Sequence, residues 1–276
     1  MPISPTQKLC VTPPAISGRL DRINMKKISV IIPCYMQADY VSDAVLSVVN
    51  QTVPPEEILV LTMDEKSNDK LRQLTNYLKL PSDYLRWLTT PKQYVPAARN
   101  YLISQSIGDY FIPLDADDYL ESNFIEEVSK IDADIVYTDA QEFGISNKKL
   151  CIDREASLEK LRYRNCIHCC SLVKRDSFEK SGKYNETLIH GLEDYELWLN
   201  MYKHGYHAKY CESTFFWYRR KNHSMVMGVA RNPERIYQMV RDLHPDLHKW
   251  GLIQLVKFKL NKYRVIIRSG GKLQGS

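Results

Sequence analysis

The chain has 276 residues, 44% of them hydrophobic and 26% charged, which suits one large α/β domain with a terminal extension, or at most two small domains. No apolar run approaches the roughly 18–20 residues that span a bilayer, and the N-terminus lacks the apolar core of a secretory signal, so we expect a cytoplasmic protein without membrane spans. The net charge of +5 comes from residues 247–276, which hold seven Lys and Arg but no Asp or Glu; this excludes a nucleic-acid-binding body and predicts a basic appendage.

The predicted elements start at Lys27, after a lead-in at 1–26 whose Pro, Ser and Thr content predicts flexibility. The nearly continuous apolar run at 28–32 predicts a strand buried on both faces, and apolar residues at helical spacing over 39–50 predict the first helix. The alternation continues with strands at 57–61, 84–88, 109–114 and 134–138 and with helices at 71–80, 96–104 and 122–130. This order predicts an α/β fold, Rossmann-like, with a mostly parallel sheet and helices on both faces.

An acidic cluster, Asp115-Ala116-Asp117-Asp118, directly follows the predicted strand at 109–114. Because such sheets bind ligands at the carboxyl ends of their strands, the polar residues after the first, second and fourth strands should share one edge. In an extended chain Asp115 and Asp117 project to one side, and two converging carboxylates favour a cation between them. Oxygen ligands suit Mn²⁺ or Mg²⁺. The alternative is that Asp118 caps the next helix and the other two are solvated turn residues.

The seven cysteines are irregularly spaced. Cys166, Cys169 and Cys170 lie near His168, a grouping that invites a zinc site. No second ligand pair stands at finger-like spacing, so reduced and at least partly buried thiols are the favoured interpretation.

A segment that starts at Gly191 predicts an amphipathic helix with Glu193 and Asp194 at its N-terminus. The helix dipole stabilises carboxylates at this position, which explains both acids without a catalytic role. Alternatively, one of them accepts a proton from a hydroxyl nucleophile as a general base. The residues by themselves leave both interpretations open.

The predicted C-terminal extension covers residues 231–276. From Leu252 onward, apolar residues recur on one helical face with basic residues mostly opposite, although Lys259 intrudes on the apolar side. Such a helix would lie on an anionic membrane, as a peripheral contact at the inner face, or pack on the rest of the chain with its basic face in water.

Six segments together resemble the family-two inverting glycosyltransferases of the GT-A fold. They stand in the order and spacing of that family, at 29–35, 48–52, 97–100, 108–118, 193–198 and 216–225. The resemblance implies a GT-A domain at 27–230, with a donor half at about 27–138 and an acceptor half at about 139–230. It also implies transfer of a sugar from a nucleotide-diphosphate donor, with a UDP-sugar favoured, to a glycan or lipid-linked acceptor in cell-surface polysaccharide or glycoconjugate synthesis.

Positions that match the family's motifs imply roles for the donor side. Pro33 and Tyr35 would line the nucleotide pocket, and Arg99 would lie near the base or the diphosphate. Asp115 would contact the ribose or the donor sugar. Asp117 would ligate Mn²⁺ or Mg²⁺, with Asp115 as a further ligand.

The resemblance also implies roles for the later segments. Asp194 would be the catalytic base, and Glu193 beside it would position acceptor or donor. Trp198 would either pack the helix under the site or meet an acceptor sugar. Arg219 and Arg220 would fold over the diphosphate.

The sequence departs from the family at two places. Relatives usually carry Asp-Asp-Gly-Ser after the second strand, where the first Asp recognises the base; here Thr62 holds that place, and Thr62 or Asp64 would substitute. Relatives also often show a His two residues after the Arg of the late segment, where this chain has Lys221, with His223 two further on. Lys221 would neutralise the diphosphate or His223 would ligate the metal; the alternative is that one of the two is simply a loop residue.

Two other classes of protein stay open at this point. A sugar-phosphate nucleotidyltransferase shares an α/β nucleotide domain and an acidic metal site, but usually has a Gly-rich basic loop after the first strand, where this chain has no Gly. A catalytically degenerate protein would bind a sugar nucleotide or glycan without turnover. The altered segment at Thr62 favours this second alternative, whereas Asp115, Asp117 and Asp194 together argue against it.

Overall fold

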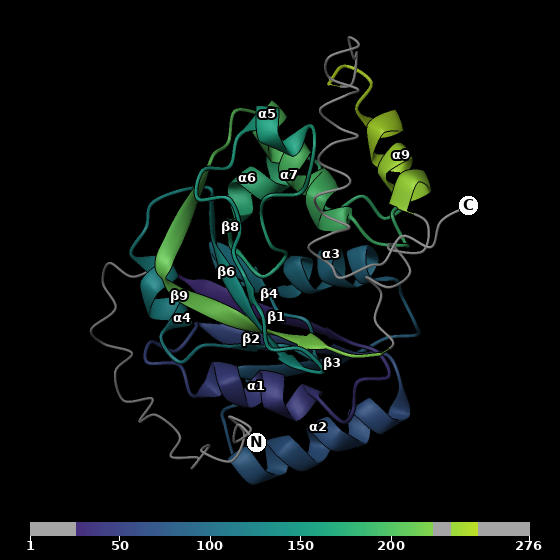
Figure 1. The fold of residues 1–276 in the computed structure, drawn as a ribbon. Helices are drawn as coiled ribbons and strands as arrows, with labels where there is room; N and C mark the ends of the chain where they lie inside the picture. The colour runs from purple at the N-terminus through teal and green to yellow at the C-terminus, as the bar shows by residue number, and fades with distance from the viewer. Residues whose placement is uncertain (1–25, 223–232, 248–276) are drawn as a thin grey trace.

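The computed structural model describes residues 26–222 and 233–247. Within these ranges one nine-stranded sheet lies between two layers of helices (Figure 1). The strands are β1 (Ile28–Cys34), β2 (Glu57–Thr62), β3 (Leu85–Thr89), β4 (Tyr110–Pro113), β5 (Tyr119–Leu120), β6 (Ile135–Gly144), β7 (Lys149–Leu150), β8 (Leu172–Lys174) and β9 (Ala208–Arg220). The helices are α1 (Val41–Val49), α2 (Glu65–Leu78), α3 (Val95–Gln105), α4 (Phe124–Ser129), α5 (Leu158–Leu161), α6 (Arg175–Lys180), α7 (Glu193–Lys203) and α9 (Pro233–Leu243).

The sheet has a parallel half and a mixed half. Strand β1 pairs in parallel with β2 and β4, and β2 pairs in parallel with β3, so the predicted parallel sheet is confirmed for the first part of the chain. Strand β8 then runs antiparallel to both β4 and β6, and β9 is parallel to β6. The short strands β5 and β7 add antiparallel pairs at β9 and β6. The α/β class is therefore confirmed. The sheet has more antiparallel pairing than the alternation of strands and helices along the sequence predicts.

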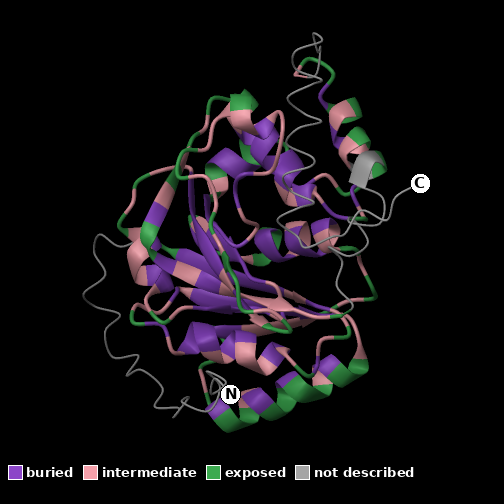
Figure 2. Ribbon diagram, viewed as in Figure 1, coloured by how far each residue is buried: buried purple, intermediate pink, exposed green. Residues whose placement is uncertain are grey.

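Two hydrophobic cores cover the opposite faces of the sheet, and the strands between them are largely buried (Figure 2). In β1, Val30 and Ile32 face the core that α1 and α2 cover, whereas Ile31 faces the core of α3 and α7. Strand side chains alternate between faces, so a strand covered on both sides needs an unbroken apolar run. The apolar run at 28–32 meets this requirement, and helices on both faces are confirmed.

Helix α2 begins earlier than the predicted helix at 71–80. Its N-cap is Asp64, whose Oδ1 accepts a hydrogen bond from the Ser67 amide at 2.9 Å. An acidic N-cap of this kind satisfies an amide that the first turn leaves without a partner. The first turn carries mostly polar residues, so the apolar periodicity begins only at Leu71, one and a half turns into the helix.

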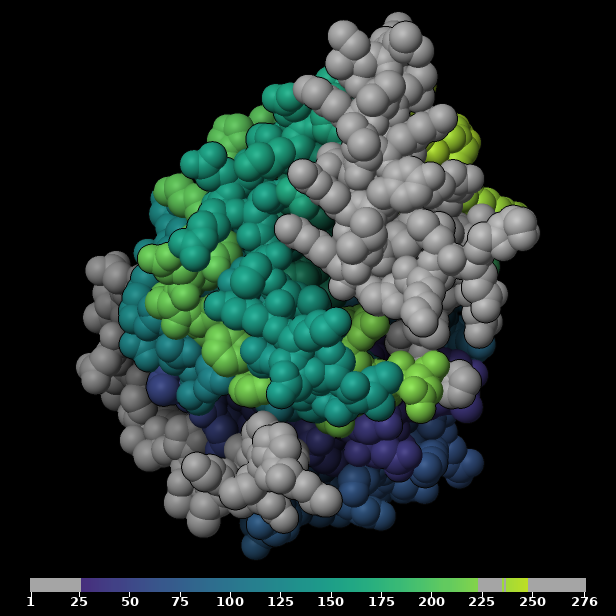
Figure 3. Space-filling model, viewed as in Figure 1, coloured from purple at the N-terminus to yellow at the C-terminus, as the bar shows by residue number. Residues whose placement is uncertain are grey.

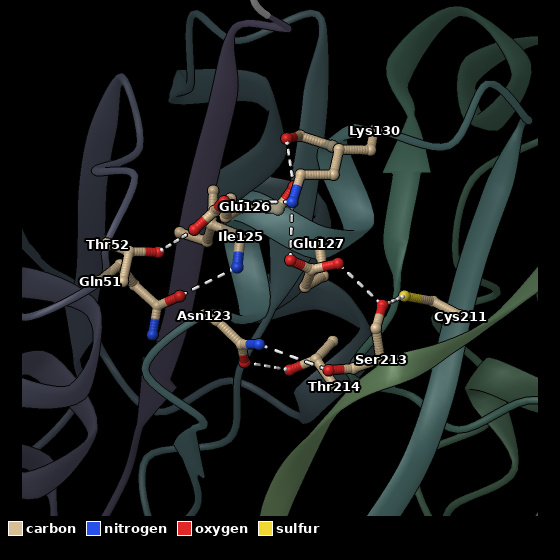
Figure 4. Close-up of polar contacts among 11 residues, drawn as sticks. Gln51, Thr52, Asn123, Ile125, Glu126, Glu127, Lys130, Cys211, Ser213 and Thr214 are labelled. Carbon is tan, nitrogen blue, oxygen red and sulfur yellow. Dashed lines mark hydrogen bonds and ion pairs between the residues drawn. The ribbon is translucent and has the colours of Figure 1, made fainter.

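Side chains from two distant segments fix helix α4 (Figure 4). Gln51, just after α1, accepts a hydrogen bond from the Ile125 amide at 2.9 Å through its Oε1. Ser213 of β9 donates to Glu127 at 2.8 Å. These contacts hold the helix after the acidic cluster against both the first helical layer and β9, which positions that cluster between them.

Gly108 lies where the chain entering β4 passes close to β1. A Cβ at this position would lie 2.7 Å from the amide nitrogen and from Oγ of Ser29, and 2.7 Å from the Tyr110 carbonyl oxygen. We expect Gly108→Ala to lower the free energy of unfolding by about 1–3 kcal/mol, because the strands must separate to admit the methyl group. Urea unfolding beside Gln73→Ala, a change on the exposed face of α2, measures this; equal midpoints for the two variants would contradict the close approach.

Helix α9 packs on α7. Val240 is fully buried in the core that α7 shares, and the rings of Tyr195 and Tyr237 lie 5.8 Å apart between centroids. Arg162 Nε donates to the Leu247 carbonyl at 2.6 Å. Residues 1–25, His223 and the predicted tail helix from Leu252 lie outside the described residues. In the part of the chain that is described, no helix is both long and apolar enough to cross a membrane.

Candidate active site

The ends of three parallel strands meet at one edge of the sheet. The register pairs Cys34 at the end of β1 with Thr62 at the end of β2, and Ile31 with Pro113 at the end of β4. Polar loops therefore follow all three strands at the same edge, as predicted. Asp64 ties two of these loops together, because its Oδ2 accepts the Met36 amide hydrogen bond at 2.7 Å.

The acidic turn at 115–118 closes through its backbone, with the Asp118 amide donating to the Asp115 carbonyl at 3.0 Å. The Asp118 side chain is buried and accepts a hydrogen bond from the Arg219 amide at 2.7 Å. Burial, together with the charges of Asp117 and Asp115, raises the pKa of Asp118 well above its usual range. The alternative that Asp118 caps the next helix is wrong, since its side chain joins the turn to β9.

Lys221 binds the second carboxylate of the turn. Its Nζ lies 2.5 Å from Asp117 Oδ2, donates to Gln37 Oε1 at 3.1 Å and sits 4.7 Å from the ring centroid of Tyr40. Both members of the ion pair are mostly buried, with side chains 18% and 19% exposed. Lys221 therefore places its ammonium group against the acidic turn, and its role toward the diphosphate stays a prediction.

Arg219 and Arg220, at the end of β9, point to different partners. Arg219 donates through Nε to the Asp117 carbonyl at 2.8 Å, and its guanidinium pairs with Asp43 of α1 at 3.2 Å. In the space-filling view, green atoms from the end of β9 lie against purple atoms from the first part of the chain (Figure 3). Arg220 instead pairs with Glu142 of β6 at 3.3 Å. Arg219 thus supports the acidic turn directly, whereas Arg220 braces the neighbouring strand.

Arg99 lies inside the protein rather than on a donor-facing surface. Its side chain is 2% exposed, and its guanidinium makes two ion pairs of 2.7 Å, one with Asp115 and one with Glu193. The guanidinium carbon also lies 5.6 Å from the ring centroid of Tyr184. The two carboxylates and the core enclose the guanidinium, and the implied position of Arg99 near the base or the diphosphate stays a prediction. Arg99 acts on the site through Asp115 and Glu193.

Asp194 follows Glu193 in the first turn of α7. Asn165 donates from Nδ2 to Asp194 Oδ2 at 2.9 Å. Burial, reinforced by the charge of Glu193, raises the pKa of Asp194 to about 7, against the opposing effects of Arg99 and of hydrogen bonds from the Tyr195 amide and Asn165. A carboxylate with a pKa near the working pH has the property that general-base catalysis needs.

Two of the residues with predicted ligand contacts, Trp198 and Thr62, are fully buried. Trp198 is fully buried and donates from Nε1 to the Ile167 carbonyl at 3.2 Å, so the acceptor role is wrong and the packing alternative holds. Thr62 is also fully buried, and its hydroxyl hydrogen-bonds Asn68 and the Leu88 carbonyl. Its side chain has no surface to offer a nucleotide base, which leaves Asp64 as the candidate.

The remaining donor-side residues flank the loop after β1. Pro33 is half-buried near the end of that strand, and Tyr35 is half-buried just after it. The ammonium of Lys92, in the loop before α3, lies 4.7 Å from the ring centroid of Tyr35. The roles of Pro33, Tyr35 and Asp64 in nucleotide binding stay predictions.

A divalent cation would be held by Asp115 and Asp117. Their side chains are 34% and 19% exposed, and each already has one oxygen in an ion pair with a cationic side chain. Among the described residues no three His, Cys, Asp or Glu side chains converge as a complete metal site. Mg²⁺ typically binds one or two protein carboxylates together with substrate phosphates. The residues therefore fit a cation that arrives with a diphosphate, for which Asp115 and Asp117 would supply two ligands.

Among the described residues, the cysteine cluster and His168 do not form a set of side chains that could hold a metal ion. Burial lowers the pKa of His168 to about 4, and its ring packs against Phe216 with centroids 5.5 Å apart. Burial and the charges of Asp115 and Asp194 raise the pKa of the Cys169 thiol well above its usual range.

Three residues that the sequence analysis passed over belong to this site. Asn165 orients Asp194, Gln37 holds Lys221, and Tyr184 lies beside Arg99. Gln37 lies in the loop after the first strand, which the sequence places at the ligand-binding edge of the sheet. Its position in the sequence could therefore have identified it. Asn165 and Tyr184 stand in segments without periodicity or motif, and only the fold brings them to the site.

The sheet order and the acidic turn at the carboxyl edge define an α/β protein of the GT-A type. The family model described as glycosyl transferase family 2 matches residues 29–182, more than half of the chain, and the protein belongs to this family.

The relatives described next are named as glycosyltransferases. The chain is 25% identical over 250 residues to the putative teichuronic acid biosynthesis glycosyltransferase TuaG of Bacillus subtilis, covering 85% of this chain and 96% of that protein. It is 30% identical over 193 residues to an uncharacterised glycosyltransferase of Rickettsia conorii, covering 64% of this chain. The match to the poly(ribitol-phosphate) beta-glucosyltransferase of Bacillus spizizenii is 36% identical over 98 residues, covering 35% of this chain. The chain spans only 31% and 16% of the lengths of these last two relatives.

Solved structures agree in fold. The crystal structure of S. aureus TarS 1-349 in complex with UDP-GlcNAc matches with a TM-score of 0.62 at 17% identity. The match covers 79% of this chain and 65% of that one. This likeness confirms the GT-A fold, and at this identity it shows the fold alone.

Proposed function

We propose that this chain is an inverting glycosyltransferase that moves a sugar from a nucleotide-diphosphate donor, preferably a UDP-sugar, to a hydroxyl of a glycan or lipid-linked acceptor. The fold matches a protein whose crystal structure contains UDP-GlcNAc, and two relatives carry names from cell-wall polymer synthesis. These likenesses support synthesis of a cell-surface polysaccharide or glycoconjugate. Residues 247–276 would hold the protein at an anionic membrane surface, where lipid-linked acceptors lie.

The observation that carries the proposal is the chain of ion pairs through Arg99. It joins Asp115 of the acidic turn to Glu193, whose neighbour Asp194 has a raised pKa. This chain of ion pairs supports the proposal because it joins the turn that would bind the donor to the segment of the candidate base, about 80 residues further along the chain. Ordinary helix capping explains the acids at the start of α7, but it does not explain a buried arginine shared with the acidic turn.

The donor side has to stabilise the charge that grows on the leaving nucleoside diphosphate. Asp117 and Asp115 would hold Mn²⁺ or Mg²⁺, which supplies Lewis-acid stabilisation of that charge. Lys221 adds a fixed ammonium beside Asp117, and Arg219 holds the turn in shape. Electrostatic groups already in place at the developing charge cost little reorganisation during the reaction.

The acceptor side has to remove one proton. The acceptor oxygen forms a bond to the anomeric carbon as the bond from that carbon to the diphosphate oxygen breaks. The hydroxyl proton passes to Asp194, and the bonding electron pair leaves with the nucleoside diphosphate. Attack opposite the leaving group inverts the anomeric configuration. Asn165 orients the Asp194 carboxylate for this task through the hydrogen bond of 2.9 Å.

Turnover of a panel of UDP-, GDP- and dTDP-sugars with Mn²⁺ tests the proposal. We expect release of UDP from a UDP-sugar, slow with water and faster with a polysaccharide acceptor. Pyrophosphate release from a nucleoside triphosphate and a sugar phosphate would instead identify a nucleotidyltransferase. Donor binding without any release would identify a degenerate binding protein.

A further inference from the structure

The buried Arg99 of α3 forms ion pairs with two segments that lie far from it in the sequence. Its guanidinium lies between Asp115 of the acidic turn and Glu193 of α7, at 2.7 Å from each, and its side chain is 2% exposed. Its Nε is buried without a hydrogen-bond partner among the described residues. Burying a cation costs free energy unless carboxylates pair with it. Separating Arg99 from Asp115 or Glu193 would therefore be unfavourable for both partners.

This arrangement spans the two halves of the proposed reaction. Asp115 belongs to the turn that would bind the donor, and Glu193 is covalently adjacent to the proposed base Asp194. The planar fork of an arginine can satisfy two carboxylates in fixed directions, which the single ammonium of a lysine cannot do. The distance between the two carboxylates is therefore set by one rigid group.

We propose that Arg99 is a positioning residue that fixes the acidic turn relative to the start of α7 and so holds Asp194 opposite the donor. The inference rests on the proposed function, and it goes beyond it by assigning to this arginine control over the base. Arg99 does not contact the reacting atoms in this account.

The electrostatic surroundings of Asp194 support the assignment and give it a second consequence. Arg99 lowers the pKa of Asp194, whereas burial and Glu193 raise it. Further groups face the carboxylate from other elements, namely the amide of Asn165, the thiol of Cys169 and the hydroxyls of Tyr184 and Tyr237. None of these carries a permanent positive charge. Among the described residues, Arg99 is the cation that lowers the pKa of this buried carboxyl.

These interactions predict the direction in which three variants shift the pH dependence of kcat. A general base works in its deprotonated form, so the rate rises with pH through the pKa of Asp194, which is about 7. Removing the cation in Arg99→Met raises that pKa and moves the acid limb of the kcat profile to higher pH. Removing the anion in Glu193→Gln moves the limb to lower pH. The double variant Arg99→Met/Glu193→Gln returns it toward the wild-type position.

The experiment measures kcat against pH for the wild type, the two single variants, the double variant and Arg99→Lys. Each unit of upward shift lowers the rate on the acid side about ten-fold. Arg99→Lys keeps the charge but not the fork, so we expect its limb near the wild-type pH with a reduced plateau. Arg72→Met, an exposed arginine of α2 paired with Asp69, is the matched control and should leave the limb in place. The double variant leaves no unpaired Glu193 and guards against a single variant that fails to fold.

A ¹³C NMR titration of the Asp194 carboxyl, assigned through Asp194→Asn, gives the same shifts without turnover. Opposite movements of the carboxyl pKa in the two single variants would support the inference even if the wild type transferred no sugar, so the two proposals fail separately. Identical carboxyl pKa values in the wild type, Arg99→Met and Glu193→Gln, or a loss of kcat in Arg99→Met with no movement of its acid limb, would overturn it.

Discussion

Replacing Asp194 with Asn is expected to lower kcat by about 10²–10⁴-fold while leaving donor affinity largely unchanged. The amide keeps the size of the carboxylate and still faces Asn165, but it cannot take the proton of the acceptor hydroxyl. The donor, in this account, is held by the opposite side of the site. Initial rates with a saturating acceptor, together with calorimetric binding of UDP and Mn²⁺, separate the two quantities.

Asp176→Asn is the matched control for this change. Asp176 lies on α6 in an exposed pair with Lys180, so its replacement should leave kcat unaltered. A parallel fall of rate and donor affinity in Asp194→Asn would place this residue on the donor instead. An unchanged rate would remove it from catalysis altogether.

Replacing Asp117 with Ala is expected to weaken metal-dependent donor binding by at least the 10–100-fold that loss of an outer-shell partner typically costs. The change removes one of the two carboxylates that would hold the cation and leaves Lys221 without its partner at 2.5 Å. The remaining binding should depend less on Mn²⁺, because Lys221 then faces the diphosphate directly. Calorimetric titration of UDP at several Mn²⁺ concentrations measures both effects.

Asp109→Ala provides the comparison. Asp109 is exposed and lies just before β4, at the other end of that strand from the acidic turn, and its loss should alter neither affinity nor the Mn²⁺ dependence. If Asp117→Ala retained the full Mn²⁺ dependence of the wild type, Asp117 would not be a metal ligand. The proposed donor site would then need another cation.

Much of the fold could be predicted because the first half of the chain signals it strongly. The run at 28–32 alternates between two cores and must therefore be a strand, and Pro96 in the first turn of α3 marks the start of that helix. The second half gives weaker signals. Strands β7 and β8 have two and three residues, too short for any periodicity to show, and the antiparallel pairing of β8 depends on contacts distant in sequence.

The candidate site was predictable in location but not in its internal contacts. The carboxyl edge of the sheet, the acidic turn and the start of α7 follow from strand order and motif spacing. Whether an arginine meets solvent or closes a buried pair depends on which side chains surround it. Arg99 forms an ion pair with Glu193, 94 residues later in the chain, and no local sequence pattern predicts such a contact. Distant elements also set the burial of Trp198 and Thr62, which decides between the two alternatives for Trp198 and leaves Asp64 rather than Thr62 as the candidate for base recognition.

A crystal structure of the protein with an intact UDP-sugar and Mn²⁺ would examine the reaction geometry most directly. The expected result has the diphosphate beside Asp117 and Lys221, and the Asp194 carboxylate on the opposite side of the anomeric carbon, where an acceptor hydroxyl can lie within about 3 Å of it. A donor bound elsewhere, or Asp194 on the same side of the sugar as the diphosphate, would contradict the proposal.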